Sequence, residues 1–314
     1  MISVIIPTHD RPGPLQRCLR GLRRQDLPMD EIEVVIVNDG GVSPRTVVDG
    51  WKGELTINLI ESRERRGVSA ARNIAIDAAQ GEYVAFLDDD DVFLPRHLSL
   101  ARSALSNADR PTLVYGDALV SEVWLEAMPR NTHGAPRKGG PFDPDFLMVA
   151  NHLHTGSVIA TNFSDLPVRF DEELDHCEDW DLWLALSEAF DGAFLNLGEI
   201  TSIYHQVPSF DGTVAGAYRS TPTAFTLARR HVYRKRPSEH PRVLAYREWL
   251  TRFDQRLDSL ISTGAQPPGH IFDRALGCMT SAFSRGLPPG ENWLDELFDG
   301  TPPPPTPSPR GGPA

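Results

Sequence analysis

Short apolar runs alternate with helical patterns through the N-terminal part of the chain. The runs occupy residues 2–6, 34–37, 55–60 and 83–87. Between the first two runs, apolar side chains recur at the spacing of one helix face, at Leu15, Cys18, Leu19 and Leu22. This alternation is typical of a parallel sheet whose strands are joined by crossover helices. We therefore predict an α/β fold with a mostly parallel, Rossmann-like sheet flanked by helices.

The fourth apolar run ends in four consecutive carboxylates, Asp88 to Asp91. Two like charges about 5 Å apart repel by roughly 3 kcal/mol at an effective dielectric of about 20, so the cluster requires solvent or a cation. Because side chains alternate along an extended chain, Asp88 pairs with Asp90, and Asp89 with Asp91. Such a pair suits Mg²⁺ or Mn²⁺, which fill their other positions with water and phosphate oxygens. The alternative is a solvated acidic turn before the helix that Pro95 would open.

Polar residues follow three of the predicted strands. Thr8, Asp39 and Asp88 each stand directly after an apolar run or close to its end. In open α/β sheets, ligands bind in the crevice outside the carboxyl ends of the strands. We therefore expect these three side chains to converge on one site.

Composition limits what this site can bind. The chain has 314 residues, of which 40% are hydrophobic, so it can bury a substantial core in one large domain or two smaller ones. Its formal charge of −12 speaks against broad binding to nucleic acid or to an anionic membrane. We infer that the phosphates of a ligand would be bound by local groups.

The spacing of the cysteines and the length of the apolar segments indicate in which cellular compartment the protein is expected. Cys18, Cys177 and Cys278 are odd in number and widely spaced, which favours free thiols in a reducing environment, with Cys18 in the core. The first residues do not resemble a signal peptide, and no stretch approaches about 18 apolar residues. We expect a soluble cytoplasmic protein without a transmembrane segment.

A second acidic group begins a predicted helix. One apolar face of this helix is formed by Leu182, Trp183, Leu186 and Phe190. Glu178, Asp179 and Asp181 then lie in its first turn, where acidic groups complement the helix dipole. A purely structural role is therefore the alternative for each of these carboxylates.

The C-terminal part of the chain is helical in pattern. Apolar residues between Tyr246 and Ile261 recur at helical spacing, which predicts an α-helical extension. This extension would cover the sheet, bind an acceptor or form a homodimer, and periodicity does not separate these roles. The Pro- and Gly-rich residues 301–314 predict a disordered tail. Residues 129–141 form either a mobile lid or a solvated connection.

The order of these motifs resembles the family 2 glycosyltransferases, which have the GT-A fold. The matching segments are residues 3–8, 37–40, 67–73, 81–91 and 170–172, followed by 178–184. The resemblance covers about residues 1–206 and rests on the order of the five motifs. It implies a GT-A catalytic domain over residues 1–212, the helical extension over 213–300 and the tail over 301–314.

The resemblance implies transfer of a sugar from a nucleotide diphosphate donor, with a UDP-sugar expected, to an acceptor hydroxyl with inversion at the anomeric carbon. By similarity, Pro7, Thr8 and Asp39 would line the nucleoside pocket, with Asp39 accepting a hydrogen bond from the base. Arg72 would lie beside the base or the diphosphate. In the acidic cluster, Asp88 would face the ribose and the Mg²⁺ or Mn²⁺ ion, and Asp90 would hold the metal. The second pair, Asp89 and Asp91, has the same spacing and remains an alternative for the metal.

Further roles follow from the same resemblance. Asp179 corresponds to the general base that takes the acceptor's hydroxyl proton, with Asp181 as the alternative. His205 stands where it would complete the metal or diphosphate site, although a structural role is the alternative. His152 and His154 are candidates for the acceptor pocket.

The role of one basic group and two alternative functions remain open. Arg63, Arg65 and Arg66 would favour a diphosphate, but a solvated loop explains them equally well. A nucleotidyltransferase would share the sheet and the acidic site, but no Gly-rich phosphate loop follows the first strand. The remaining alternative is a sugar-nucleotide-binding protein without transferase activity.

Overall fold

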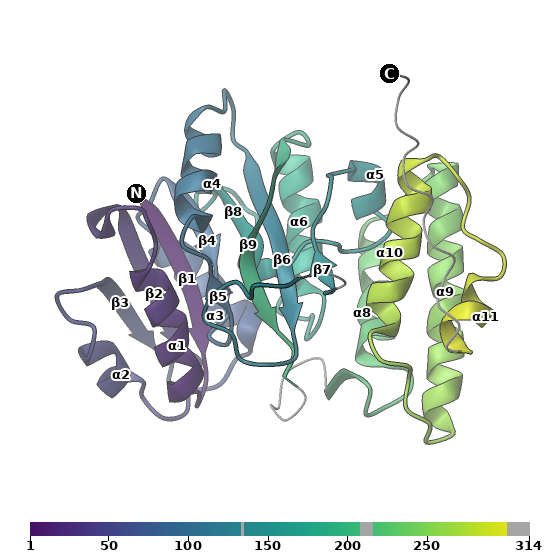
Figure 1. Cartoon of the computed structure of the whole chain (residues 1–314), viewed down its shortest axis with the longest axis horizontal. Coiled ribbons are helices and arrows are strands. Elements are labelled where there is room, and N and C mark those ends of the chain that lie inside the picture. Colours follow the sequence, from purple (N-terminus) through teal and green to yellow (C-terminus); the bar gives the residue numbers. More distant parts are fainter. Residues whose placement is uncertain (133–134, 208–215, 300–314) are drawn as a thin grey trace. The chain divides into compact units, whose positions relative to one another are not determined.

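The computed structural model describes residues 1–132, 135–207 and 216–299. The chain forms two compact units (Figure 1). One comprises Met1–Pro144 and Asn151–Gly216, and the other comprises Asp145–Ala150 and Ala217–Ala314. The predicted boundary between residues 212 and 213 and the predicted tail over residues 301–314 both lie outside the described residues.

The first unit is built on one mixed sheet. In spatial order its strands run β3-β2-β1-β4-β8-β6-β9-β5, with β7 paired to β6. Their bounds are β1 Ile2–Thr8, β2 Ile32–Asn38, β3 Thr56–Glu61, β4 Tyr83–Phe86, β5 Val92–Phe93, β6 Leu113–Ser121, β7 Arg137–Lys138, β8 Val158–Thr161 and β9 Phe194–His205.

The part of the sheet from β3 to β4 is parallel, and β6 also runs parallel to β9. Strand β8 lies antiparallel between β4 and β6. Every residue of β1, β2 and β4 is buried, which explains why these strands read as continuous apolar runs rather than alternating ones. The predicted α/β class with a mostly parallel sheet is confirmed, and the antiparallel β5, β7 and β8 are a refinement of it.

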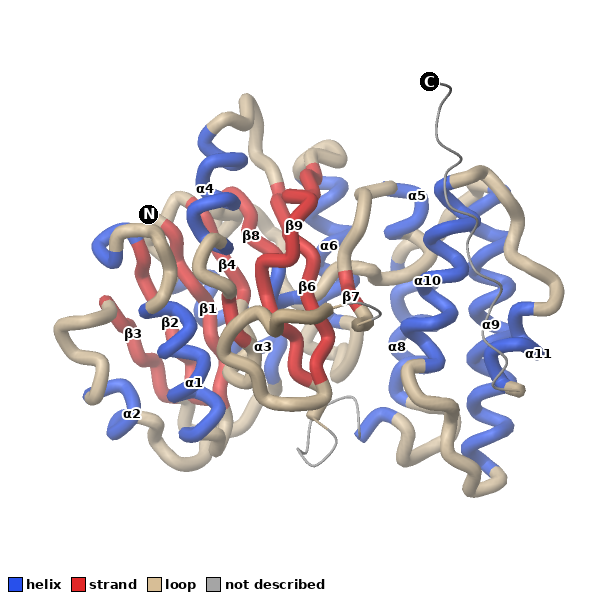
Figure 2. The backbone as a smooth tube through the Cα atoms, in the orientation of Figure 1, coloured by secondary structure: helices blue, strands red, loops and turns tan. Residues whose placement is uncertain are grey.

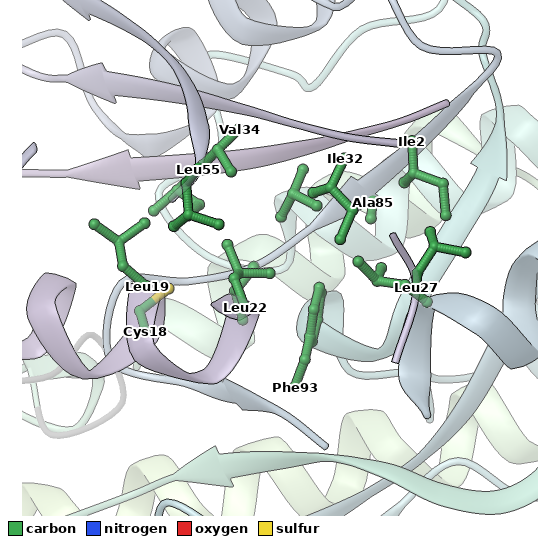
Figure 3. Close-up of a cluster of buried hydrophobic side chains, with 14 of the residues drawn as sticks. Ile2, Cys18, Leu19, Leu22, Leu27, Ile32, Val34, Leu55, Ala85 and Phe93 are labelled. Atoms are coloured by element: carbon green, nitrogen blue, oxygen red, sulfur yellow. The ribbon is translucent and has the colours of Figure 1, made fainter. Parts of the chain in front are cut away.

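Helices flank this sheet. They are α1 Pro12–Arg23, α2 Arg45–Asp49, α3 Val68–Ala78, α4 His97–Ser106 and α6 Glu178–Ala189, with 3-10 turns η1 at Met29–Glu31 and η2 at Thr155–Ser157. Helix α1 has Pro12 in its first turn, where the missing N–H costs nothing. Figure 3 shows that the predicted face of α1, including Cys18 and Leu22, points into a core with Val34 of β2.

The loop that was expected to be a lid or a connection is partly a strand. Residues 137–138 form β7 and pair with Ala118 and Leu119 of β6. Residues 133–134 are outside the described part of the chain. Within the described residues, the end of this loop is therefore attached to the sheet.

The regular secondary structure described in the second unit consists of helices joined by loops (Figure 2). Its helices are α8 Ala224–Lys235, α9 Pro241–Ser262, α10 Ile271–Ser284 and α11 Trp293–Phe298, and the short α5 Pro144–Leu147 leads into the segment Asp145–Ala150 that belongs to this unit. The core contains Tyr246, Trp249 and Phe253 of α9 with Met279 and Phe283 of α10. The predicted helical extension is confirmed. Of the helices described in either unit, none combines the length and the apolar character needed to cross a bilayer.

Candidate active site

The carboxyl ends of β1, β2 and β4 bring the first group of polar side chains together. Thr8 lies in register with Asn38, while Pro7 is buried beside Val37. The hydroxyl of Thr8 donates a 2.6 Å hydrogen bond to Asp89 in the loop after β4. The backbone N–H of Asp39 donates to the carbonyl of Thr8 at 2.9 Å. The three strand ends are thus joined at one edge of the sheet, with Asp89 rather than Asp88 in contact with Thr8.

Asp39 fastens this edge to the start of α3. Its two carboxylate oxygens accept the backbone N–H groups of Arg66 and Gly67, each at 2.8 Å. Gly67 has a φ of +96°, a conformation that favours glycine. Because each carboxylate oxygen accepts about two hydrogen bonds, Asp39 retains the capacity for the predicted contact with a base. The Arg66 side chain, from the basic group before Gly67, pairs with Glu172 at 3.1 Å.

The four consecutive aspartates have different environments. Asp91 is 1% exposed and accepts hydrogen bonds from the His205 backbone N–H and from His154 Nε2, both at 2.8 Å. Asp89 is 3% exposed and is bound by Thr8. The side chains of Asp88 and Asp90 are 29% and 17% exposed. All four carboxylates have partners within the protein, but Asp88 and Asp90 are the more exposed pair and so the one more accessible to a cation.

Buried like charges dominate the electrostatics of this loop. Burial and the neighbouring carboxylates raise the pKa of Asp90 well above its usual range. Burial would also raise the pKa of Asp88, but the charge of Arg72 outweighs it and lowers that pKa. Arg11 adds a guanidinium 3.1 Å from Asp90 and 3.3 Å from Asp89. A partly exposed, oxygen-only pair within an excess of negative charge fits a hard divalent cation such as Mg²⁺ or Mn²⁺.

Arg72 connects the acidic loop to the second acidic group. Its side chain is 3% exposed, and it donates to Asp88 at 2.6 Å and to Glu178 at 2.7 Å. The guanidinium also lies 5.1 Å from the centre of the Phe170 ring. Burial lowers its pKa, but the two carboxylates raise it by more, so Arg72 is a permanent cation. Arg72 thus joins α3, the loop after β4 and the start of α6.

Asp179 lies in the first turn of α6. Its Oδ2 accepts hydrogen bonds from Asn151 Nδ2 at 3.0 Å and from Thr155 Oγ1 at 2.9 Å. Its Oδ1 accepts the Trp180 backbone N–H at 2.7 Å. Burial, followed by the charge of Glu178, raises the pKa of Asp179 to about 6. At neutral pH, Asp179 is therefore ionised and more basic than an ordinary aspartate.

The alternative base, Asp181, lies in a different environment. It is 1% exposed, whereas Asp179 is partly exposed. A general base must come within hydrogen-bond reach of the acceptor hydroxyl. The burial of Asp181 thus favours Asp179 for this role.

The structure does not support the prediction that His205 binds the metal. Its Nδ1 lies 2.7 Å from the carbonyl oxygen of Asp90, and its Nε2 accepts the Leu125 backbone N–H at 3.0 Å. Burial lowers the pKa of His205, so the ring is neutral, with the proton on Nδ1. Because both ring nitrogens are bound to backbone groups, His205 supports the acidic loop instead of offering a ligand atom.

His152 and His154, predicted for an acceptor pocket, are both buried. They are 1% and 7% exposed, and His154 stacks on Tyr204 with ring centres 4.2 Å apart while binding Asp91. Neither ring is open to an acceptor, because each is packed inside the first unit.

Two residues that contact Asp179, Asn151 and Thr155, were not predicted from the sequence. The only sign of them there is a short polar run before the apolar β8.

Comparisons with known proteins show what this chain is similar to. Residues 3–131 match the sequence profile described as Glycosyl transferase family 2. Over these residues, the chain is a member of glycosyltransferase family 2. The matched residues of this glycosyltransferase contain β1 and β2, Arg72 and the whole acidic loop. The predicted family and enzyme class are confirmed.

Two curated relatives of this glycosyltransferase are bacterial proteins. It is 29% identical to the uncharacterized glycosyltransferase YwdF of Bacillus subtilis over 192 residues, which are 60% of this chain and 69% of that protein. It is 26% identical to chondroitin synthase of Pasteurella multocida over 221 residues. Those residues are 68% of this chain but 21% of the synthase, so the chain spans about a fifth of that protein.

Solved structures share the fold. Staphylococcus aureus TarS, residues 1–349 in complex with UDP-GlcNAc, superposes with a TM-score of 0.62 and 18% identity, covering 96% of this chain and 88% of that one. The mannosyltransferase PcManGT from Pyrobaculum calidifontis, in complex with GDP-Man and Mn²⁺, gives a TM-score of 0.58 and 18% identity, with coverages of 94% and 82%. The GT-A fold that the resemblance implied is confirmed.

Proposed function

We propose that this glycosyltransferase transfers a sugar from a nucleotide diphosphate donor, with a UDP-sugar as the first choice, to an acceptor hydroxyl with inversion. The observation that carries the proposal is the link from Asp88 through Arg72 to Glu178, because it joins the exposed carboxylate pair to the turn that bears Asp179. The complexes of TarS with UDP-GlcNAc and of PcManGT with GDP-Man support a nucleotide-sugar donor.

The donor would bind at the edge formed by β1, β2 and β4. Pro7, Thr8 and Asp39 line this edge, and Asp39 has acceptor capacity left for an N–H of the base. Arg72 is buried and donates to both Asp88 and Glu178, so we assign it to holding Asp88 beside the ribose. Asp88 and Asp90 would hold Mg²⁺ or Mn²⁺, which when bound would stabilise the charge of the departing diphosphate.

Asp179 would act as the general base. Its carboxylate takes the proton of the acceptor hydroxyl while that oxygen forms a bond to the anomeric carbon. The bond from the anomeric carbon to the diphosphate oxygen breaks on the opposite side, and its electron pair leaves with the diphosphate. One displacement inverts the configuration, so the step requires no nucleophile from the enzyme.

A donor screen with anomeric analysis tests this proposal. The purified chain would be incubated with UDP-, GDP- and dTDP-sugars and simple glycoside acceptors, with Mg²⁺, with Mn²⁺ or with chelator. We expect release of one nucleoside diphosphate that depends on the cation, and a product whose anomeric configuration is opposite to that of the donor, read by proton NMR. A retained configuration, or equal turnover with chelator, would overturn the corresponding part of the proposal.

A further inference from the structure

Residues 151–156, which we call the bridging segment, contact both acidic groups of the site. Two of its side chains, those of Asn151 and Thr155, donate hydrogen bonds to Oδ2 of Asp179 at 3.0 and 2.9 Å. Between them, His154 Nε2 binds Oδ2 of Asp91 at 2.8 Å. The segment therefore holds the first turn of α6 and the loop after β4 at the same time.

The bridging segment is itself fixed by its own hydrogen bonds. Asn151 Oδ1 accepts the Leu153 backbone N–H at 3.0 Å, and the carbonyl of His154 accepts the Ser157 hydroxyl at 2.8 Å. Gly156 leaves room for the histidine, because a Cβ there would lie 2.7 Å from His154 Nε2 and 3.3 Å from Asp91 Oδ2. Asn151 and Thr155 are thus presented to Asp179 from a rigid backbone.

The two oxygens of Asp179 have different capacities to accept a proton. Each carboxylate oxygen offers about two acceptor positions. Those of Oδ2 are filled by Asn151 and Thr155, whereas Oδ1 accepts one hydrogen bond, from the Trp180 backbone N–H. The position open for an incoming proton is on Oδ1.

We propose that Asn151 and Thr155 are positioning residues of the transfer step, which clamp Oδ2 of Asp179 so that Oδ1 receives the acceptor's proton. This inference rests on the proposed role of Asp179 as the base. The clamp prevents rotation of the carboxylate, which would exchange its two oxygens. His154 contributes by holding the bridging segment to Asp91.

The clamp also sets the proton affinity of the base. The charged groups around Asp179 are Glu178, which raises its pKa, and Arg72, which lowers it, while His154 is neutral because burial lowers its pKa to about 4. Hydrogen bonds to the ionised form favour that form, and the Thr155 hydroxyl acts in this direction. Loss of this hydroxyl would raise the pKa of Asp179 further.

The test compares pH profiles of kcat/KM for Thr155→Val and Thr155→Ser. The valine is isosteric but has no donor, so we expect the acid limb of the profile to move up by about one pH unit, which lowers kcat/KM about fivefold at pH 6. The serine retains the hydroxyl and should keep the original limb. Thr161→Val is the matched control, because Thr161 ends β8, the strand that follows Thr155, and its hydroxyl bonds to the backbone of Thr112.

A second variant keeps the inference testable if Thr155→Val folds poorly. Asn151→Asp keeps the oxygen that accepts the Leu153 N–H, but replaces the donor to Asp179 with a second carboxylate oxygen. We expect a larger upward shift of the acid limb than for Thr155→Val, with the Kd for UDP and Mn²⁺ unchanged by calorimetry.

An unmoved acid limb in both variants would overturn the inference, as would weaker UDP binding without a shift, since that result indicates a purely structural role. Failure of the proposed function looks different. If Asp179→Asn retained full turnover, Asp179 would not be the base, whatever the two positioning variants did.

Discussion

Nη1 of Arg72 donates a 2.7 Å hydrogen bond to Oε1 of Glu178, although 106 positions separate the two residues in the sequence. Nη2 of the same guanidinium contacts Asp88 at 2.6 Å. One buried cation thus pairs with a carboxylate from each acidic group. The distance between the two groups depends on this side chain.

Replacing Arg72 should therefore affect both stability and binding. Arg72→Ala leaves two carboxylates without their cation, which we expect to lower the free energy of unfolding by about 3–5 kcal/mol. Arg72→Lys keeps the charge but not the forked geometry, so it should retain part of the stability and bind UDP more weakly. Urea unfolding and calorimetry would measure both effects. Equal stability of Arg72→Ala and the wild type would contradict the pairing.

Activity should fall on the acid side of neutrality. The pKa of Asp179 is raised to about 6, and only the ionised carboxylate accepts a proton. We therefore expect kcat/KM to rise as pH increases through about 6 and then to level off, measured by nucleoside diphosphate release from pH 4.5 to 8. A profile already flat at pH 5 would show that the base has an unperturbed pKa.

Asp179→Asn should lower kcat for sugar transfer strongly and leave donor binding unchanged. Loss of a general base lowers kcat by about 10²–10⁴-fold, while the donor edge of the sheet is unchanged. Asp175→Asn, four residues earlier and exposed, is the control and should retain wild-type kcat. Parallel loss of UDP binding in Asp179→Asn would instead indicate a structural defect.

Divalent cations should stabilise the folded chain. A ligand that binds only the native state at a hundredfold excess over its Kd adds about 2.7 kcal/mol, which a thermal melt detects. We expect Mn²⁺ or Mg²⁺ to raise the Tm of the wild type, and Asp90→Asn to abolish most of the rise. Asp49→Asn, in the exposed part of α2, should keep it. An identical rise in all three proteins would place the cation elsewhere.

Replacing Gly67 with a residue that has a side chain should lower both the stability of the chain and its affinity for UDP. Its φ of +96° disfavours any L residue, so we expect Gly67→Ala to destabilise the chain by about 1–3 kcal/mol, although open space surrounds the added Cβ. The strain would be relieved by moving the Gly67 N–H away from Asp39, so UDP binding should weaken as well. Chemical unfolding and a UDP titration would measure the two effects, and Gly53→Ala, also at positive φ but distant in sequence, controls for strain alone.

Local patterns were sufficient to predict the parallel part of the sheet. Strands β1, β2 and β4 are buried on both faces, so each appears in the sequence as a continuous apolar run. The polar residues that follow these runs predicted where the site lies, at the carboxyl ends of the strands. Asp88 and Asp90 are the more exposed pair of the acidic cluster, but extended alternation is not the reason, because Asp89 and Asp90 form a turn in which the Asp91 N–H donates to the Asp88 carbonyl at 3.1 Å.

The contacts behind this edge had no local signal. Strand β8 pairs antiparallel with β4, Val84 beside Ala160, and this pairing brings the residues just before β8 to the loop after β4. Neither the pairing nor its register is encoded by periodicity. The sequence also gave no sign of the partners of His205, which was predicted to bind the metal. Its ring nitrogens bond instead to backbone groups of Asp90 and Leu125, which are distant in sequence.

The double attachment of residues 151–156 has a practical meaning for redesign. Loop grafting is a common route to a new acceptor preference, and the stretch that precedes β8 is an inviting place to cut. A graft crossing His154 or Thr155 would remove contacts to both Asp179 and the acidic loop, so exchanged sequences should end before Asn151 or begin after Ser157.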